Sequence, residues 1–430
     1  MPLILLADDE PGILTTLSGV LVDQGLETLT TRSGEEAVRL YREHQPDAVF
    51  LDIWLPDRDG LEVLAALKAA DPDAAVIMIS GHGTAATAVK AIKMGAFDYL
   101  EKPLGYDQVV EAVKGALGQR QRRQAGTPTG AMPVLEAAPR RISPLPQLPI
   151  LKAGKEPQRT IQQSTVMYGL GLHSGGRTGM VLQPLPPGSG IHFLSLPSGD
   201  LIPAHVTSVA DTDYATTLAG GTAQVKTTEH LLSALHACGV TNLLVKLHGE
   251  VPVLDGSAID FCRMLEQIGL QDQDEPRQEL VIDRCYEVGQ GEKRLTIEPY
   301  DGFAVSYLLR YPPPIGEQQY EFELDGFERY KEEIAPARTF GFVRDLKMMS
   351  EMGLGSGGRL DNFILVGEDN VVNTELRFPD EFVRHKILDI LGDLYLLGYP
   401  VRGKVTARLT GHRDNVALLK QIWSAQNAPA

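Results

Sequence analysis

Five short apolar runs alternate with stretches of helical spacing over the first 118 residues of this 430-residue chain. Strands that alternate with helices form a parallel sheet covered by helices on both faces. We therefore expect an α/β domain whose ligand site lies where the strands end. The runs are LILLA (3–7), TLTT (28–31), AVFLD (48–52), VIMIS (76–80) and DYLEK (98–102).

The residues at the ends of these runs suit phosphoryl chemistry. Asp8, Asp9 and Asp52 would cluster, and grouped carboxylates bind a hard cation such as Mg²⁺. With the cation and Lys102 neutralising charge, Asp52 could attack a phosphoryl donor. Each residue alone has a simpler reading, because Asp after a strand is commonly a turn residue or an N-cap. Together with Ser80, the five positions indicate one site.

The segment resembles the receiver domain of bacterial two-component response regulators over its full length. The matching motifs are ADDE, LDIWLPDRDG, SGHGT and YLEKPL. The resemblance implies a flavodoxin-like fold for residues 1–118, with a sensor histidine kinase or phosphotransfer protein as partner and a homodimer through the receiver. It also implies roles for individual residues: Asp52 as phosphoacceptor, Asp8, Asp9, Asp52 and the Trp54 carbonyl as Mg²⁺ ligands, Ser80 and Lys102 as phosphoryl contacts, and Tyr99 as the switch residue.

Residues 119–158 are rich in Pro, Gly and Arg and show no sustained hydrophobic period, which is typical of a linker. A solvated tether is favoured over a segment docked on an acidic neighbour or on anionic lipid. The net charge of −16 argues against DNA binding. No apolar run could span a membrane, so we expect at most peripheral membrane contact. The three cysteines form no CxxC pair, and there is no signal peptide, so a cytoplasmic protein is expected.

The stretch 380–400 predicts a mostly buried helix that ends at Gly398. His385, Asp389 and Asp393 share one face of it, although unpaired buried charge is costly. A second predicted helix, residues 227–238, carries Glu229 and His230 near its start. Two His and one carboxylate form a ligand set typical of catalytic zinc, with Glu229 placed as a general base. Buried His–Asp pairs that serve structure alone are the competing interpretation.

Residues 159–424 closely resemble the UDP-3-O-acyl-N-acetylglucosamine deacetylases of lipid A biosynthesis. The matching segments, in family order, are GLGLHSG, TTEHLLSAL, VPVLDGSA, ARTFGF, LDNFILV, LRFPDEFVRHKILDILGDLYLLG and TGHRDN. The resemblance implies two α+β two-layer subdomains, about 159–275 and 276–424, joined within QDQDEPRQ. It further implies that residues 341–373 form an acyl-chain passage, in which Arg359 stands where the family usually has Ser.

The resemblance also implies the site residues. His230, His385 and Asp389 would bind Zn²⁺, and Glu229 would be the general base. The remaining roles are His412 as charged acid or oxyanion partner, Asp393 orienting it, Thr339 holding the oxyanion, Phe340 contacting the sugar, and Lys386 and His173 near the substrate. The expected activity is hydrolysis of the N-acetyl group of UDP-3-O-(3-hydroxyacyl)-N-acetylglucosamine, regulated by phosphorylation of Asp52.

A second hypothesis is a non-catalytic, phosphorylation-responsive signalling protein that uses the deacetylase fold to bind a partner or a nucleotide-sugar. It is disfavoured because every expected acid, base and ligand residue is present. A DNA-binding regulator is suggested by the receiver alone, and the acidic C-terminal part lacks a helix-turn-helix pattern.

Overall fold

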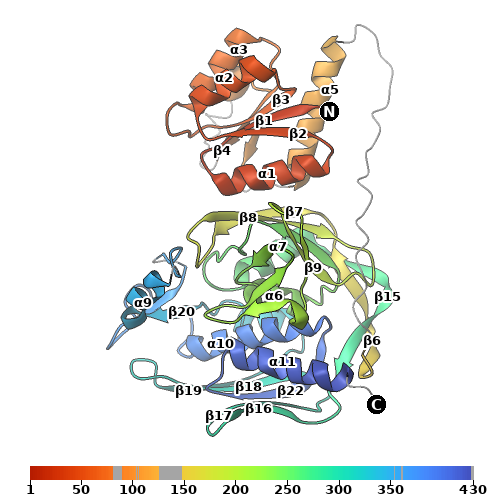
Figure 1. Cartoon of the computed structure of the whole chain (residues 1–430), viewed down its shortest axis with the longest axis vertical. Helices are drawn as coiled ribbons and strands as arrows, with labels where there is room; N and C mark the ends of the chain where they lie inside the picture. The colour runs from red at the N-terminus through yellow and green to blue at the C-terminus, as the bar shows by residue number, and fades with distance from the viewer. Residues whose placement is uncertain are drawn as a thin grey trace. The chain divides into compact units, whose positions relative to one another are not determined.

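The computed structural model describes residues 1–80, 90–102, 104, 106–124, 148–352, 354–359 and 362–427 (Figure 1). The chain divides into two compact units, which are described separately. Residues 81–84 of SGHGT, 360–361 of LDNFILV and 125–147 of the expected linker lie outside the described residues. Among the described residues, no helix combines the length and the apolar character needed to cross a membrane.

The first unit is built on a five-stranded parallel sheet in the order β2-β1-β3-β4-β5. All five strands fall on the apolar runs, so this part of the fold prediction is confirmed. The strands are β1 (Leu3–Ala7), β2 (Glu27–Thr31), β3 (Ala48–Asp52), β4 (Val76–Ser80) and β5 (Asp98–Glu101).

Helices cover both faces of this sheet. Alternate residues of β1 enter two different cores, Ile4 and Leu6 on one face and Leu5 and Ala7 on the other, as the period-two geometry of a strand requires. The first face packs against α1 (Pro11–Asp23) and α5 (Tyr106–Gln124), and the second against α2 (Gly34–His44) and α3 (Gly60–Ala70). Figure 1 shows α2 and α3 together on one side of the sheet and α1 on the other.

The chain from residue 148 onward contains two larger sheets, a three-stranded sheet and a two-stranded one. The first large sheet has the order β10 (Leu201–Pro203), β9 (Ile191–Ser195), β14 (Leu243–Leu247), β8 (Arg177–Pro184), β7 (Thr165–Leu170). The second has β16 (Tyr286–Gln290), β17 (Lys293–Glu298), β22 (Val401–Arg408), β15 (Leu270–Val281) and β6 (Leu151–Ile161), with β18 (Phe303–Arg310) and β19 (Glu317–Glu323) branching from β22. The small sheets are β11 (Val209–Asp211), β12 (Thr217–Gly220) and β13 (Ala223–Val225), and β20 (Phe340–Phe342) with β21 (Ile364–Val366).

Helices lie between and beside these sheets. They are α6 (Glu229–Cys238), α7 (Ile259–Ile268), α8 (Phe327–Glu333), α9 (Leu346–Glu351), α10 (Glu381–Leu394) and α11 (His412–Asn427), with short 3₁₀ turns η1 (Val206–Ser208), η2 (Val343–Asp345) and η3 (Tyr395–Leu397). The predicted helix ends are confirmed, because Gly239 and Gly398 end α6 and η3 in the left-handed conformation that suits glycine.

Helices α6 and α10 pack directly against each other, because position 392 of α10 has no side chain. A Cβ atom built on Gly392 would overlap the carbonyl oxygen of Glu229 at the start of α6. Both helices are almost wholly buried. Their close approach brings the polar residues of the two helices into one site.

Both ends of the expected linker carry regular structure. Helix α5 continues to Gln124, and β6 begins at Leu151. Leu148 and Ile150 are buried just before β6, and the polar QDQDEPRQ segment lies within its antiparallel partner β15. The C-terminal end of the linker is thus part of the sheet of the second unit.

Candidate zinc site and phosphoacceptor site

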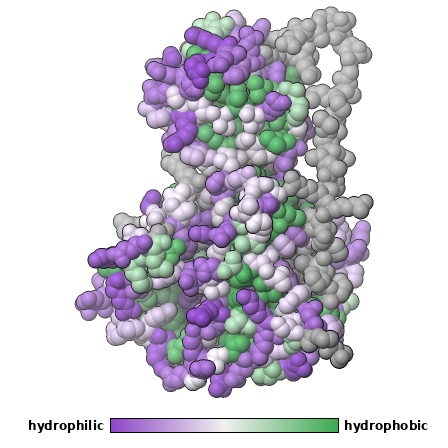
Figure 2. All heavy atoms as spheres, in the orientation of Figure 1, coloured by the Kyte–Doolittle hydropathy of each residue, from purple (hydrophilic) through white to green (hydrophobic). Residues whose placement is uncertain are grey.

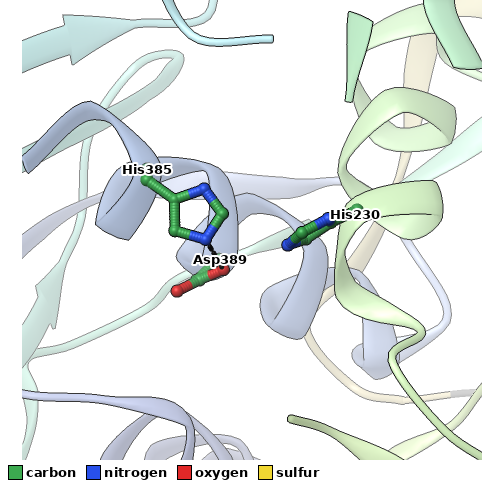
Figure 3. A group of neighbouring side chains, drawn as sticks. All are labelled: His230, His385 and Asp389. Carbon is green, nitrogen blue, oxygen red and sulfur yellow. Dashed lines mark ion pairs between the residues drawn. The ribbon is translucent and has the colours of Figure 1, made fainter. Parts of the chain in front are cut away.

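His230, His385 and Asp389 converge from α6 and α10 (Figure 3). One ligand atom from each residue lies within 4.8 Å of the other two, and all three side chains are buried. The rings of His230 and His385 meet edge to face with centroids 5.0 Å apart. The predicted trio is therefore brought together, with two nitrogen atoms and one oxygen atom as donors.

The hydrogen bonds of this trio leave ligand atoms available to a cation. His385 Nδ1 donates to the carbonyl oxygen of Ala337 at 3.1 Å, which leaves the Nε2 lone pair 3.4 Å from Asp389 Oδ1. Within the described part of the chain, Asp389 Oδ1 and His230 Nδ1 are buried without a hydrogen-bond partner. Orphaned buried acceptors are costly, and a metal ion would satisfy them.

The charge states of the ligands also suit a metal. Burial lowers the pKa of His230 to about 3 and that of His385 below its ordinary value, so both imidazoles are neutral at pH 7. Burial alone would raise the pKa of Asp389, but Lys386 and His385 hold it well below its usual range. Lys386 Nζ donates to Asp389 Oδ2 at 2.9 Å. The carboxylate is thus ionised and oriented.

Glu229 lies beside His230 at the first position of α6 and is buried. Its Oε2 accepts the backbone N–H of Thr216 at 3.1 Å. Burial raises the pKa of Glu229 to about 7, against the opposing charge of His412. A carboxylate whose pKa lies near neutrality can take up and release a proton during turnover.

His412 begins α11 and faces the same site. Its Nδ1 is 2.8 Å from Asp393 Oδ2, and its Nε2 is 3.7 Å from Asp389 Oδ2. Burial would lower the pKa of His412, but the carboxylates of Asp393 and Asp389 raise it to about 9. The imidazole is therefore protonated at pH 7, as expected of a charged acid.

These groups open into one pocket of about 310 Å³. Among the substrate-binding candidates, Phe340 and Lys386 line it and Thr339 lies on its wall, whereas His173 is not among the lining residues. The ring of His173 is buried, and neither of its nitrogen atoms has a partner in the described structure. The Lys386 ammonium sits 5.4 Å from the centre of the Phe340 ring.

The segment expected to form the acyl passage borders this pocket and exposes several large apolar side chains. Arg344, Asp345 and Met349 line the pocket. The most exposed apolar side chains of the segment are Val343, Leu346, Met348, Met352 and Val372. Figure 2, in the orientation of Figure 1, shows green among purple in the region of α9 and β20. Arg359 is exposed, bonds the carbonyl oxygens of Ser356 and Gly358, and does not line the pocket.

The strand ends of the first unit form a second polar cluster. Asp8, Asp9, Glu10 and Asp52 place carboxylate oxygens within 4.8 Å of one another. Lys102 Nζ lies 2.9 Å from Asp8 and from Asp52 and 3.2 Å from Glu10. Burial, reinforced by Asp52, raises the pKa of Asp8 to about 7, and burial also raises that of Asp52. Such a cluster of carboxylates favours a bound cation.

The remaining receiver candidates lie at the ends of neighbouring strands. Ser80 is fully buried at the end of β4, next to β3. The backbone N–H of Trp54 donates to Asp52 Oδ1 at 3.4 Å, and its indole is exposed. The hydroxyl of Tyr99 is buried and has no partner among the residues described.

Two comparisons with family models cover most of the chain. Residues 158–424 match the model of UDP-3-O-acyl N-acetylglycosamine deacetylase. The chain belongs to this deacetylase family. Residues 4–114 match the response regulator receiver domain. The deacetylase family is a zinc enzyme family, and receiver domains in general bind Mg²⁺.

Individual relatives agree with this deacetylase membership. The UDP-3-O-acyl-N-acetylglucosamine deacetylase of Myxococcus xanthus is 43% identical over 62% of this chain and 86% of its own length. That of Helicobacter hepaticus is 40% identical over 63% of this chain and 91% of its own.

A solved receiver domain protein from Clostridium thermocellum is 34% identical over 28% of this chain and 98% of its own, with a TM-score of 0.28.

Sequence reasoning missed two residues of these sites. Glu10 lay within the quoted ADDE motif but received no role, although its carboxylate joins the receiver cluster. Thr216 of the deacetylase lies between β11 and β12, outside every quoted segment, and bonds both Glu229 and Asp393. A threonine between short strands gives no sequence signal, because its partners come from distant helices.

Proposed function

We propose that the chain is a zinc-dependent deacetylase that hydrolyses the N-acetyl group of UDP-3-O-(3-hydroxyacyl)-N-acetylglucosamine and releases acetate in lipid A biosynthesis. The observation that carries the proposal is the shared pocket of the His230–His385–Asp389 trio, the buried Glu229 and the protonated His412. The family membership of the chain supports the substrate.

His230, His385 and Asp389 would hold the Zn²⁺ ion. When bound, zinc polarises the acetamide carbonyl and lowers the pKa of a water molecule toward about 7. Lys386 keeps the second oxygen of Asp389 engaged, so that Oδ1 remains directed toward the two imidazoles.

The proton transfers belong to the chain's own residues. Glu229 Oε2 is occupied by the Thr216 N–H, so Oε1 is the atom that takes the proton as water attacks the acetyl carbon. His412 Nδ1 is engaged by Asp393, so its Nε2 proton is free to stabilise the oxyanion, together with Thr339. A protonated group then returns the proton to the leaving glucosamine nitrogen. Phe340, Lys386 and His173 would bind the sugar and its substituents.

We further propose that the receiver regulates this activity. Asp52 would accept a phosphoryl group from a sensor histidine kinase or a phosphotransfer protein, with Mg²⁺ held by Asp8, Asp9, Asp52 and the Trp54 carbonyl. Ser80 and Lys102 would contact the phosphoryl group, and Tyr99 would follow it inward. The receiver and the deacetylase would occupy residues 1–118 and 159–424, and the chain would be a cytoplasmic protein that forms a dimer through the receiver. Of the expected linker 119–158, the start continues α5 to Gln124 and the end from residue 148 belongs to the fold of the second unit.

The test measures bound zinc and acetate release on the purified full chain. Wild type should hold about one zinc per deacetylase site and release acetate, whereas Glu229→Gln should keep the zinc and lose on the order of 10² or more in rate. Stoichiometric zinc without acetate release in wild type would support the signalling hypothesis instead. Loss of metal in Glu229→Gln would make Glu229 a ligand and reverse its assigned role.

A further inference from the structure

Thr216 contacts the proposed base and the proposed acid machinery at once. It is fully buried between β11 and β12. Its backbone N–H donates to Glu229 Oε2 at 3.1 Å, and its hydroxyl donates to Asp393 Oδ1 at 2.6 Å. Its carbonyl oxygen accepts from the hydroxyl and the N–H of Thr228, which precedes α6. Every polar atom of Thr216 is therefore bonded to the elements that build the pocket.

The hydroxyl of Thr216 fixes which oxygen of Asp393 serves His412. Asp393 Oδ1 accepts from Thr216, while Oδ2 accepts from Asn415 and lies 2.8 Å from His412 Nδ1. Asp393 is fully buried, so a carboxylate oxygen left without a donor would be costly. With Oδ1 occupied, the carboxylate cannot rotate away from His412 without losing a bond.

The backbone of the same residue orients the base. Because an N–H can only donate, Glu229 Oε2 is held as an acceptor and Oε1 is left to receive the proton. The base Glu229 and the acid His412 come from different helices, α6 and α11. Both are in contact with Thr216, which lies outside those helices. One residue therefore contacts the groups of both helices and links the orientations of their side chains.

We propose that Thr216 is a positioning residue that aligns Glu229 and the Asp393–His412 pair for the proposed deacetylation. The inference rests on the proposed function. Thr216 is neither a member of the metal trio nor one of the residues that line the pocket. It acts through Glu229, Asp393 and His412, whose Nδ1 lies 3.4 Å from the Thr216 hydroxyl. Its hydroxyl should therefore affect turnover more than substrate binding.

The test compares four single variants of the full chain, Asp393→Asn among them, and one double variant. Thr216→Val keeps the shape and the backbone N–H but removes the hydroxyl, and Thr216→Ser restores the hydroxyl. Thr160→Val is the matched control, because Thr160 is also buried and its hydroxyl donates to the carbonyl oxygen of Asn242 at 2.6 Å, away from the site. Thermal unfolding, bound zinc, kcat and KM are measured for each protein.

Thr216→Val should lower kcat by about 10- to 100-fold with KM changed less than about threefold and zinc retained. Thr216→Ser should recover kcat to within about threefold of wild type. Thr160→Val should unfold at a lower temperature and keep kcat. The double variant Thr216→Val/Asp393→Asn should lose little more activity than Asp393→Asn alone, because the hydroxyl of Thr216 acts on the Asp393–His412 pair, which Asp393→Asn already disrupts.

A proton NMR readout does not depend on turnover. The Nδ1 proton shared by His412 and Asp393 should resonate at the same low-field position in wild type and Thr216→Ser, and shift or broaden in Thr216→Val. Wild-type kcat together with an unchanged resonance in Thr216→Val would overturn the inference, as would failure of Thr216→Ser to recover. If wild type released no acetate, the proposed function would fall, and the resonance would still decide the positioning role.

Discussion

Asp389 offers its two oxygen atoms to two different partners, the Lys386 ammonium and the proposed metal ion. Oδ2 accepts a hydrogen bond from Lys386, while Oδ1 lies 3.4 Å from His385 Nε2 and has no hydrogen-bond partner in the described residues. The ammonium group belongs to the chain, whereas a metal ion would have to bind from solution. Lys386 therefore keeps the carboxylate ionised and oriented before a metal ion arrives, which favours capture of the ion from solution.

Removal of Asp389 should abolish metal binding. Two neutral imidazoles hold catalytic zinc poorly, so Asp389→Ala should retain well below one zinc per chain after dialysis and show almost no acetate release. Elemental analysis and an acetate assay check this. Asp380→Asn is the control at the start of the same helix, because Asp380 is the N-cap residue of α10, pairs with Arg384 and is not part of the metal trio. Normal zinc and turnover in Asp389→Ala would refute the ligand assignment.

The alkaline limit of activity should depend on Asp393. The pKa of His412 is raised to about 9, so the protonated form that acts as acid is present at pH 7 and lost as pH rises through the folded pKa. Asp393→Asn removes a main cause of this rise, so the alkaline limb of kcat/KM should move to lower pH. A bound cation lowers the pKa of His412 in both proteins, which leaves the direction of the difference unchanged.

The pH profile of kcat/KM for wild type and Asp393→Asn checks this. The stability attributable to His412 protonation follows the same sign: it is complete below pH 6.5 and disappears toward pH 9, and Asp393→Asn should flatten that dependence. Superimposable alkaline limbs in an active variant would show that His412 is not the acid.

At the scale of elements, the contact between α6 and α10 governs the site. Each helix contributes ligands that the other lacks, and Gly392 sets how closely the two backbones approach. A methyl group at position 392 must push α10 away from Glu229, because a backbone carbonyl cannot give way as a flexible side chain can.

Gly392→Ala should therefore destabilise the fold and loosen the metal site together. We expect a loss of about 1–3 kcal/mol in the free energy of unfolding and a weaker affinity for zinc. Gly326→Ala is the control, because a Cβ there meets open space and the backbone is extended. Chemical denaturation and zinc titration check both variants, and equal zinc affinity in the two would argue against a rigid α6–α10 contact.

The sequence predicted elements well where one period dominates. The strands of the first sheet are apolar runs between helices, and α10 has a buried face long enough to be recognised. It could not show that the polar QDQDEPRQ segment lies in a strand, because β15 is held by pairing with the distant β6 and exposes much of both faces. For His236, six residues after His230, helical spacing predicts a side chain that faces elsewhere and leaves a surface role and a packing role both open. The structure shows it buried, stacked on Tyr395 and hydrogen-bonded to the carbonyl oxygen of Leu391 of α10.

At the scale of the whole molecule, phosphorylation should change deacetylase output. The other carboxylates of the cluster and Lys102 lie close to Asp52. We expect a coupling free energy of about 1–3 kcal/mol between phosphorylation and deacetylase activity, through dimer formation or occlusion of the active site. Acetate release and sedimentation are measured with and without a small-molecule phosphoryl donor. In Asp52→Asn, the donor should change neither acetate release nor sedimentation. Phosphoryl labelling that persists in this variant would refute Asp52 as the phosphosite.

The start of β6 and the buried residues just before it have a practical consequence for dividing the chain. The family match begins at residue 158, but Leu148 and Ile150 are buried upstream, and Leu151, Lys152 and Ala153 pair with Leu280, Glu279 and Gln278 of β15. A fragment cut at the family boundary would bare the edge of β15, which invites edge-to-edge association.

A deacetylase fragment that begins at residue 148 should therefore stay monodisperse and retain zinc, whereas one that begins at 158 should aggregate or unfold at a lower temperature. Size-exclusion chromatography and thermal melting of the two fragments distinguish these outcomes. Equal behaviour would mean that the added strand is dispensable. If the longer fragment behaves better, the end of the expected linker serves as an additional strand of the deacetylase. The boundary given by the family match at residue 158 then lies ten residues inside the folded domain.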